Sequence, residues 1–271
     1  MGKFDNIFII TDVDNTFLRS DRSLSERNVE AIKYFVNEGG KFTFATGRVH
    51  SSLLRNVSIA SELANAPGVM ANGTYLYDFK LDKVLDASYL PEKEAREVAD
   101  FIFAYNDEFG MRFATTRGTI YARIPPDYLG DYERLVHKNL IVEEQKDWRF
   151  DDCYKIVVRG RCEELNALRA EVEARFANKF AFVKSEATFF EIQNKNCSKG
   201  EAINSIRKHY RDQGVEIKVY ACGDYENDIS MLKVADVAVC PENASDSVKD
   251  ICHMHLCHCN DGVIGDLIER L

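Results

Sequence analysis

The 271-residue sequence lacks several features that would assign it to a specialised class of protein. No apolar run reaches the roughly 18 residues that a membrane-spanning helix requires. The opening residues, Met1 to Asn6, contain neither the apolar stretch nor the small-residue cleavage site of a secretory signal. We therefore expect a cytoplasmic protein with no membrane partner.

An excess of positive charge is also missing. The formal charge of -9 comes from 44 acidic and 35 basic residues, and the basic residues are scattered instead of forming a stripe. This distribution argues against nucleic acid as a partner. An acidic protein that acts on an anionic ligand must supply positive charge locally, which here would come from a metal ion and a few placed Lys or Arg side chains.

The eight cysteines do not have the spacing of a small disulfide framework. Three of them, with three of the six histidines, lie in the segment 252–259. Residues 253–257 occupy the place of a last core strand, in which alternate side chains point to opposite faces, so Cys252 and His258 would be separated from the other four candidate ligands. We therefore favour a core strand with incidental thiols over a metal site.

What the sequence does contain is an alternation of strands and helices at both ends. An apolar run predicts a buried strand over Ile7–Thr11, and the spacing of Ser23 and Glu26 fits a capping box at the start of the next helix. A strand over 41–45 and a helix over about 48–63 follow. After Lys199 we expect helices over 200–210, 228–234 and from 263, and strands over 217–221, 237–239 and 253–257. Such βα alternation predicts a parallel sheet.

The middle of the chain has a different pattern. Short strands are expected over 112–115, 119–123, 154–158, 181–183 and 188–192, and helices over about 91–109, 127–137 and 162–176. We therefore predict an α/β fold in which a parallel-sheet core, residues 1–80 and 194–271, is interrupted by an inserted α+β cap domain, residues 81–193.

Four motifs carry chemically useful side chains, each at a strand end or a helix start. They are Asp12-Val13-Asp14-Asn15-Thr16, Ala45-Thr46-Gly47-Arg48, Ser198-Lys199-Gly200 and Gly223-Asp224-Tyr225-Glu226-Asn227-Asp228. Open parallel sheets place their chemistry at the carboxyl ends of their strands. Together the motifs offer a carboxylate nucleophile, a hydroxyl, a cation and further carboxylates, which is the equipment for metal-assisted phosphoryl transfer.

The first two motifs suggest roles for the reaction itself. Asp12 is the candidate nucleophile, and Asp14 could protonate the leaving alkoxide and then deprotonate the attacking water. The hydroxyl of Thr46 and the amide of Gly47 are expected to hold phosphate oxygens, and Arg48 in the same turn is a candidate substrate-binding residue.

The last two motifs supply charge. Lys199, at a helix start, could bridge the phosphate and Asp12. Asp224 and Asp228 provide hard oxygen ligands suited to Mg²⁺. Each of these residues taken alone would be explained as a cap, a turn residue or a solvated charge. The ordered set of four motifs favours the functional interpretation.

These motifs, together with Asn72-Gly73, resemble those of the haloacid dehalogenase superfamily, in particular its Cof-type phosphatase branch, over essentially the whole chain. The resemblance implies a Rossmann-like core with a large α/β cap and a Mg²⁺-dependent aspartyl-phosphate mechanism. It implies metal binding by Asp12, the main-chain carbonyl of Asp14, and Asp224, with Asp228 as a further ligand or water holder. Asn227 would lie near the phosphate.

One departure from that family is Asn15, which stands where glycine is usual. Asparagine tolerates positive φ better than other non-glycine residues, so we expect the turn to persist. The main hypothesis is a phosphatase acting on a small phosphorylated metabolite, either a sugar phosphate or a phosphorylated cofactor, as a monomer or weak homo-oligomer. The alternatives are a sugar phosphomutase and a non-catalytic phosphometabolite-binding protein.

Overall fold

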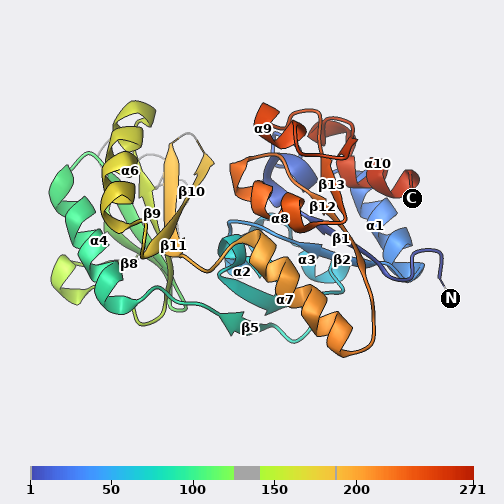
Figure 1. Cartoon of the computed structure of the whole chain (residues 1–271), viewed down its shortest axis with the longest axis horizontal. Helices are drawn as coiled ribbons and strands as arrows, with labels where there is room; N and C mark the ends of the chain where they lie inside the picture. The colour runs from blue at the N-terminus through green and yellow to red at the C-terminus, as the bar shows by residue number, and fades with distance from the viewer. Residues whose placement is uncertain (1, 125–140, 187) are drawn as a thin grey trace. The chain divides into compact units, whose positions relative to one another are not determined.

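The computed structural model describes residues 2–124, 141–186 and 188–271. The chain divides into two units, of which the first comprises Met1–Ala87 and Ser198–Leu271 and the second Ser88–Cys197 (Figure 1). The helix expected over 127–137 lies outside the described residues. The domain limits at 80/81 and 193/194 stay a prediction.

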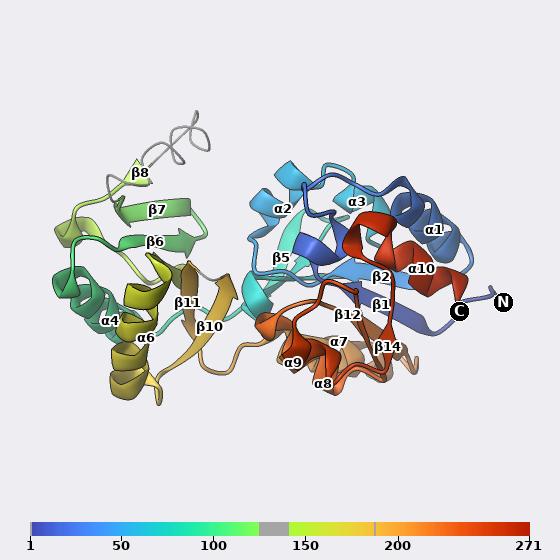
Figure 2. The ribbon, with the colours of Figure 1, turned by 90° about the horizontal axis from the view of Figure 1, so that it is seen from above.

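The first unit is built on a five-stranded parallel sheet with the order β14-β13-β12-β1-β2. Its strands are β1 (Ile7–Thr11), β2 (Lys41–Phe44), β12 (Lys218–Cys222), β13 (Val237–Cys240) and β14 (Met254–His255). In Figure 2 one side of the sheet carries α1 (Glu26–Asn37) and α10 (Val263–Glu269), and the other carries α7 (Lys199–Asp212) and α8 (Ile229–Val234). The predicted α/β class with a parallel core is confirmed.

Strand β1 is buried on both faces, which explains its uninterrupted apolar sequence. Phe8 and Ile10 lie in the hydrophobic cluster that includes Ile203 of α7 and Met231 of α8. Ile9 points to the opposite face and is also fully buried. Because neither side of β1 is solvated, the strand is held firmly, and the polar residues that follow it are delivered to a defined place at the sheet edge.

A second, smaller sheet belongs to the first unit. It is antiparallel, with the order β3 (Gly68–Met70), β4 (Tyr75–Asp78) and β5 (Lys83–Ala87). Strands β3 and β4 are joined by the single turn η2 (Ala71–Gly73), in which the φ angles of Ala71 (49°), Asn72 (58°) and Gly73 (90°) are positive. Short helices α2 (His50–Asn56) and α3 (Ala60–Leu63) connect β2 to β3.

Three local predictions are wrong in detail. The helix expected over 48–63 is divided into α2 and α3, because the buried Val57 is non-helical, with φ -126° and ψ 77°. Helix α1 is preceded by Ser25 as N-cap instead of Ser23, which lies in the preceding turn, where its backbone N–H donates to the Asp21 carboxylate and its carbonyl accepts the N–H of Arg19.

The last core strand is also shorter than expected, with only Met254–His255 paired in β14. The ring of His253 explains part of the difference, because its Nδ1 accepts the N–H of Ala238 on the neighbouring strand, at 2.8 Å. Farther along, the chain turns into η6 (Cys259–Asp261), where Nδ1 of His258 accepts the N–H of Asn260. The assignment of side chains to two faces of one strand therefore does not hold for this segment.

The second unit contains a six-stranded, mostly antiparallel sheet with the order β10-β11-β9-β6-β7-β8. Its strands are β6 (Gly110–Thr115), β7 (Gly118–Arg123), β8 (Ile141–Val142), β9 (Cys153–Arg159), β10 (Phe180–Glu186) and β11 (Phe189–Asn194). Helices α4 (Glu92–Tyr105) and α6 (Cys162–Phe176) pack on one face (Figure 2). Phe113, Ile156 and Phe190 from this face form a core with Val98 and Leu168 from the helices.

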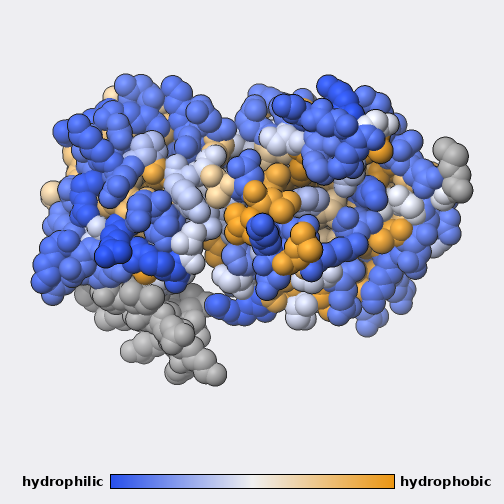
Figure 3. Space-filling model, turned by 90° about the horizontal axis from the view of Figure 1, so that it is seen from below, coloured by the Kyte–Doolittle hydropathy of each residue, from blue (hydrophilic) through white to orange (hydrophobic). Residues whose placement is uncertain are grey.

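The outer surface of both units is largely hydrophilic in the view of Figure 3, with a hydrophobic area on the first unit. The most exposed large apolar side chains of the described chain include Leu81 and Leu85, in and beside β5. Among the described residues, no helix combines the length and apolar character needed to cross a bilayer. A cytoplasmic location stays a prediction.

Candidate active site

The first site motif lies in the tight turn η1 (Val13–Phe17) that follows β1. Asp12 continues the strand, and its N–H donates to the carbonyl of Cys222 at 2.8 Å. Asn15 adopts φ 56°, which confirms the expected left-handed turn. The turn also presents Thr16, whose hydroxyl donates to Oδ1 of Asp224 at 3.0 Å. No role for Thr16 was expected from its motif, yet its hydroxyl orients one of the predicted metal ligands.

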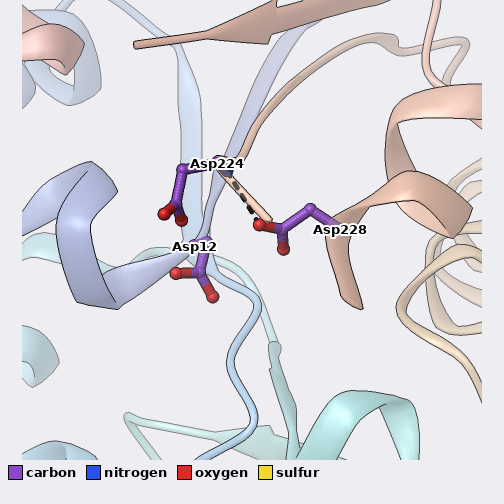
Figure 4. A group of neighbouring side chains, drawn as sticks. All are labelled: Asp12, Asp224 and Asp228. Carbon is purple, nitrogen blue, oxygen red and sulfur yellow. Dashed lines mark hydrogen bonds between the residues drawn. The ribbon is translucent and has the colours of Figure 1, made fainter. Parts of the chain in front are cut away.

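Three carboxylates converge at the ends of β1 and β12. One carboxylate oxygen from each of Asp12, Asp224 and Asp228 lies within 4.8 Å of the other two, and Figure 4 shows the three side chains together. Asp228, in the turn η5 (Glu226–Asp228), is fixed because its Oδ2 accepts the N–H groups of Asp224 and Tyr225, at 2.9 and 3.2 Å. Gly223 permits this approach, since a Cβ there would lie 2.4 Å from Cγ of Asp228.

Lys199 reaches the same cluster from the first residue of α7. Its Nζ lies 2.6 Å from Oδ1 of Asp12 and 2.6 Å from Oδ1 of Asp228, and its side chain is fully buried. The start of α7 is held by Ser198, whose hydroxyl accepts the N–H of Glu201. The helix cap therefore fixes the backbone from which the lysine extends.

The charges of this cluster do not balance. Burial raises the pKa of Asp12 well above its usual value, and the neighbouring carboxylates raise it further, although Lys199 opposes them. Burial and Asp228 raise the pKa of Asp224 to about 7. Burial favours the neutral amine of Lys199, but Asp12 and Asp228 outweigh it and raise the pKa of the lysine. One ammonium faces three buried carboxylates, so an added cation would stabilise their ionised forms.

The donor set also suits a divalent cation chemically. Carboxylate oxygens are hard ligands, which Mg²⁺ prefers, and Mg²⁺ is commonly bound by only one or two carboxylates while it retains several waters. In the described part of the chain this is the one group of three or more metal-type side chains close enough to share an ion. The residues present therefore fit a bound Mg²⁺.

The Thr46 motif forms a turn directly after β2. Thr46 is buried, its N–H donates to the carbonyl of Val69, and its carbonyl accepts the N–H of Asn72. Gly47 lies against the Asn72 side chain, because a Cβ on Gly47 would be 3.2 Å from Oδ1 of Asn72. The same oxygen accepts a hydrogen bond from Nδ2 of Asn227, at 3.3 Å.

Asn72 thus links the Thr46 and Asp224 motifs, a role that sequence reasoning did not assign. The signal that could have found it is the Asn72-Gly73 pair, which marks a turn with positive φ at the end of a strand. Asn72 is almost fully buried, as expected for a side chain that holds two loops together.

Asp14 and Arg48 form a separate pair. Nε of Arg48 lies 2.7 Å from Oδ2 of Asp14, and Nη2 lies 2.6 Å from Oδ1. The side chain of Asp14 is 40% exposed, and its carboxylate is not part of the Asp12, Asp224 and Asp228 cluster. The guanidinium that the sequence assigned to substrate binding is engaged with the predicted acid/base in this structure.

Buried carboxylates and a lysine lie together at the carboxyl ends of parallel strands, which is where α/β enzymes place their catalytic groups. The chain belongs to the haloacid dehalogenase-like hydrolase family, whose model matches residues 9–268. The resemblance inferred from the motifs is therefore confirmed.

The chain is also similar to curated relatives and to solved structures over most of its length. The chain is 25% identical over 272 residues to the 5-amino-6-(5-phospho-D-ribitylamino)uracil phosphatase of Bacillus subtilis, covering 89% of this chain and 90% of the relative. It is 25% identical over 260 residues to the pyridoxal phosphate phosphatase of Escherichia coli, covering 89% of each. A haloacid dehalogenase-like hydrolase from Bacteroides thetaiotaomicron has the same fold, with a TM-score of 0.77, 21% identity and 99% coverage of both chains.

The enzyme class follows from the family and from these relatives. The prediction of a phosphoric monoester hydrolase of the haloacid dehalogenase type is confirmed.

Proposed function

We propose that the protein is a Mg²⁺-dependent phosphatase that hydrolyses a small phosphorylated metabolite through an aspartyl-phosphate on Asp12. The observation that carries this proposal is the position of Lys199, whose Nζ lies 2.6 Å from both Asp12 and Asp228. A buried carboxylate held against an ammonium, beside two further carboxylates, suits a nucleophile that attacks an anionic phosphoryl group.

The chain's own residues account for both halves of the reaction. An oxygen of Asp12 attacks phosphorus, the bond from phosphorus to the leaving oxygen breaks, and Asp14 gives its proton to that oxygen. Water then attacks the phosphorus of the aspartyl-phosphate and loses its proton to Asp14, which releases inorganic phosphate and restores Asp12. Thr46 and Gly47 hold phosphate oxygens during both steps. Asn227, whose Nδ2 donates a hydrogen bond to Asn72, lies near the phosphate as well.

The metal site we propose consists of Asp12, Asp224 and Asp228, with the main-chain carbonyl of Asp14 added by analogy with the family. A bound Mg²⁺ would neutralise negative charge on the phosphoryl group and on these carboxylates. The hydrogen bonds from Thr16 to Asp224 and from the Asp224 and Tyr225 amides to Asp228 orient the ligands before any ion arrives.

For the substrate we propose a sugar phosphate or a phosphorylated cofactor. Support comes from relatives named for activity on a phosphorylated ribitylaminouracil and on pyridoxal phosphate. In the second unit, Arg123 donates hydrogen bonds to the carbonyl oxygens of Phe103 and Asn106, and two further cations are paired with carboxylates. Arg117 pairs with Glu143 and Asp152, and Lys155 forms a buried pair with Glu191 at 2.7 Å.

The proposal predicts that Asp12→Asn abolishes Mg²⁺-dependent hydrolysis of a generic aryl phosphate, because an amide cannot act as the nucleophile. Turnover should fall by at least about 10³-fold. The measurement is phosphate release with Mg²⁺ and with excess chelator, alongside circular dichroism to establish that the fold is kept. Asp212→Asn, at an exposed position on the last residue of α7, is the matched control and should keep wild-type turnover. Retained turnover in Asp12→Asn would contradict the mechanism.

A further inference from the structure

We propose that Arg48 is a positioning residue that acts on the reaction through Asp14. This differs from the substrate-binding role that its motif suggested. The inference rests on the proposed function, because it takes Asp14 as the group that exchanges the proton. It concerns the first unit alone, where both side chains are described.

The contact between the two side chains is bidentate. Two nitrogens of Arg48 each bind a different oxygen of Asp14, at 2.7 and 2.6 Å. A planar guanidinium that meets both carboxylate oxygens fixes the rotation of the carboxyl group as well as its position, which a point charge does not do. Asp14 needs such a restraint, because it lies within the turn η1 and its side chain is 40% exposed.

Arg48 is itself held by hydrogen bonds to neighbouring residues of the same unit. The backbone N–H of Arg48 donates to Oγ1 of Thr46 at 3.1 Å, and Nη1 of its side chain lies 3.3 Å from Oγ of Ser52 in α2. The turn Thr46–Arg48 therefore carries both the hydroxyl expected to hold phosphate and the guanidinium that restrains Asp14. The two functions are placed relative to each other by three consecutive residues.

The pairing leaves Asp14 able to accept a proton from the attacking water. Each carboxylate oxygen has two lone pairs, and the arginine fork uses one on each oxygen. The remaining lone pairs can accept a proton from water. Arg48 thus constrains the direction in which Asp14 presents its oxygens without occupying both sites on either oxygen.

The inference predicts an effect on kcat with little effect on KM. Without Arg48, Asp14 would rotate freely in solvent, and a misplacement of about 1 Å in a catalytic group can cost about 100-fold in rate. We expect Arg48→Gln to lower kcat by about 10–100-fold while KM changes by less than about twofold. Arg48→Lys should recover only part of this loss, because lysine cannot bind both oxygens.

A double-mutant cycle tests the route of the effect. Arg48→Gln is measured with an aryl phosphate in the wild-type protein and in Asp14→Asn. If Arg48 acts through Asp14, its removal from the Asp14→Asn protein should change kcat by less than about twofold. If the two losses multiply and Arg48→Gln raises KM in both backgrounds, Arg48 binds the substrate and the inference is wrong.

A second ion pair in the same unit provides a matched control. Arg207 and Asp236 are joined at 2.9 Å, and their side chains are 20% and 40% exposed, the same values as for Arg48 and Asp14. Arg207→Gln should leave kcat and KM unchanged. A wild type without turnover, or an active Asp12→Asn, would contradict the proposed function itself. If the wild type is active but the losses of kcat from Arg48→Gln and Asp14→Asn multiply, only the proposed role of Arg48 is contradicted.

Discussion

Asp12 and Asp14 are only two residues apart, yet they differ in burial and in the cation that each contacts. Asp12 is 6% exposed and contacts the buried ammonium of Lys199. Asp14 lies in a turn, is far more exposed and contacts the guanidinium of Arg48. A buried, cation-held carboxylate suits a nucleophile, and a more accessible one suits proton exchange with a leaving group and water.

Asp224 provides a prediction about pH at the same scale. Burial and Asp228 raise its pKa to about 7, from an ordinary value of 3.8. The metal-free folded state therefore holds this proton more tightly than the unfolded state. The resulting stabilisation is fully present below pH 3.8 and is lost as the pH rises through about 7. Because Mg²⁺ requires the ionised carboxylate, its stabilising effect should grow over the same range.

The measurement is the melting temperature with Mg²⁺ and with chelator, between about pH 5 and pH 8. We expect the difference between the two conditions to increase with pH in the wild type and to be smaller and flatter in Asp224→Asn. An equal Mg²⁺ effect at every pH would show that the ionisation of Asp224 is not linked to metal binding.

For single residues, the sequence predicted which side chains lie together where a residue's place at a strand end or helix start is enough to locate its side chain. Asp12, Lys199 and Asp228 could be assigned to one site because strand ends and helix starts of a parallel sheet meet at the same edge. The partner of Arg48 could not be assigned. Its long side chain can reach toward a phosphate or toward Asp14, and the choice depends on turn geometry that the motif does not specify.

Among the elements, the turn η2 and the start of α7 depend on each other. Gly73 has φ 90°, and a Cβ there would lie 2.1 Å from the carbonyl oxygen of Ser198. Ser198 directly precedes Lys199, so any shift of its backbone moves the lysine. Gly214 also has positive φ, 76°, but a Cβ there would meet no atom within 4 Å.

This pair of glycines gives a matched test of the close approach. Both alanine substitutions pay the conformational cost of positive φ, about 1–2 kcal/mol. Gly73→Ala adds a clash with backbone and should reduce the free energy of unfolding by about 2–4 kcal/mol in total. Urea unfolding measures this, and only Gly73→Ala should also lower turnover. Equal destabilisation with full turnover in both variants would mean that η2 does not help to place Lys199.

The elements themselves were predictable where the periodic pattern is long. Helix α6 has the predicted bounds, Cys162–Phe176, because Leu165, Leu168 and Val172 repeat at helical spacing and all face the core. The break between α2 and α3 was not predictable, since Val57 suits a helix pattern as well as it suits the buried turn that it occupies. The length of strand β14 was overestimated. The sequence pattern cannot show that the ring of His253 accepts the backbone N–H of Ala238 on the neighbouring strand.

In the whole molecule, each unit has a hydrophobic core of its own. One core includes Phe8, Ile203 and Met231, and the other includes Phe113 and Ile156. The change from βα alternation to short antiparallel strands indicated such an insertion. The change of pattern could not show that β5 pairs with β4. Pairing depends on two segments of the chain, and the sequence of one strand does not identify its partner. Strand β5 therefore belongs to the first unit, which extends to Ala87.

The central claim is that the phosphoryl group passes through Asp12. The most direct measurement is acid quenching of Asp14→Asn during reaction with an aryl phosphate, followed by peptide mapping by mass spectrometry. The aryl group can leave without an acid, and the intermediate should accumulate because the base for its hydrolysis is missing. We predict one phosphoryl group on Asp12. Release of the aryl alcohol with no phosphorylated peptide, or phosphate on another residue, would contradict the account.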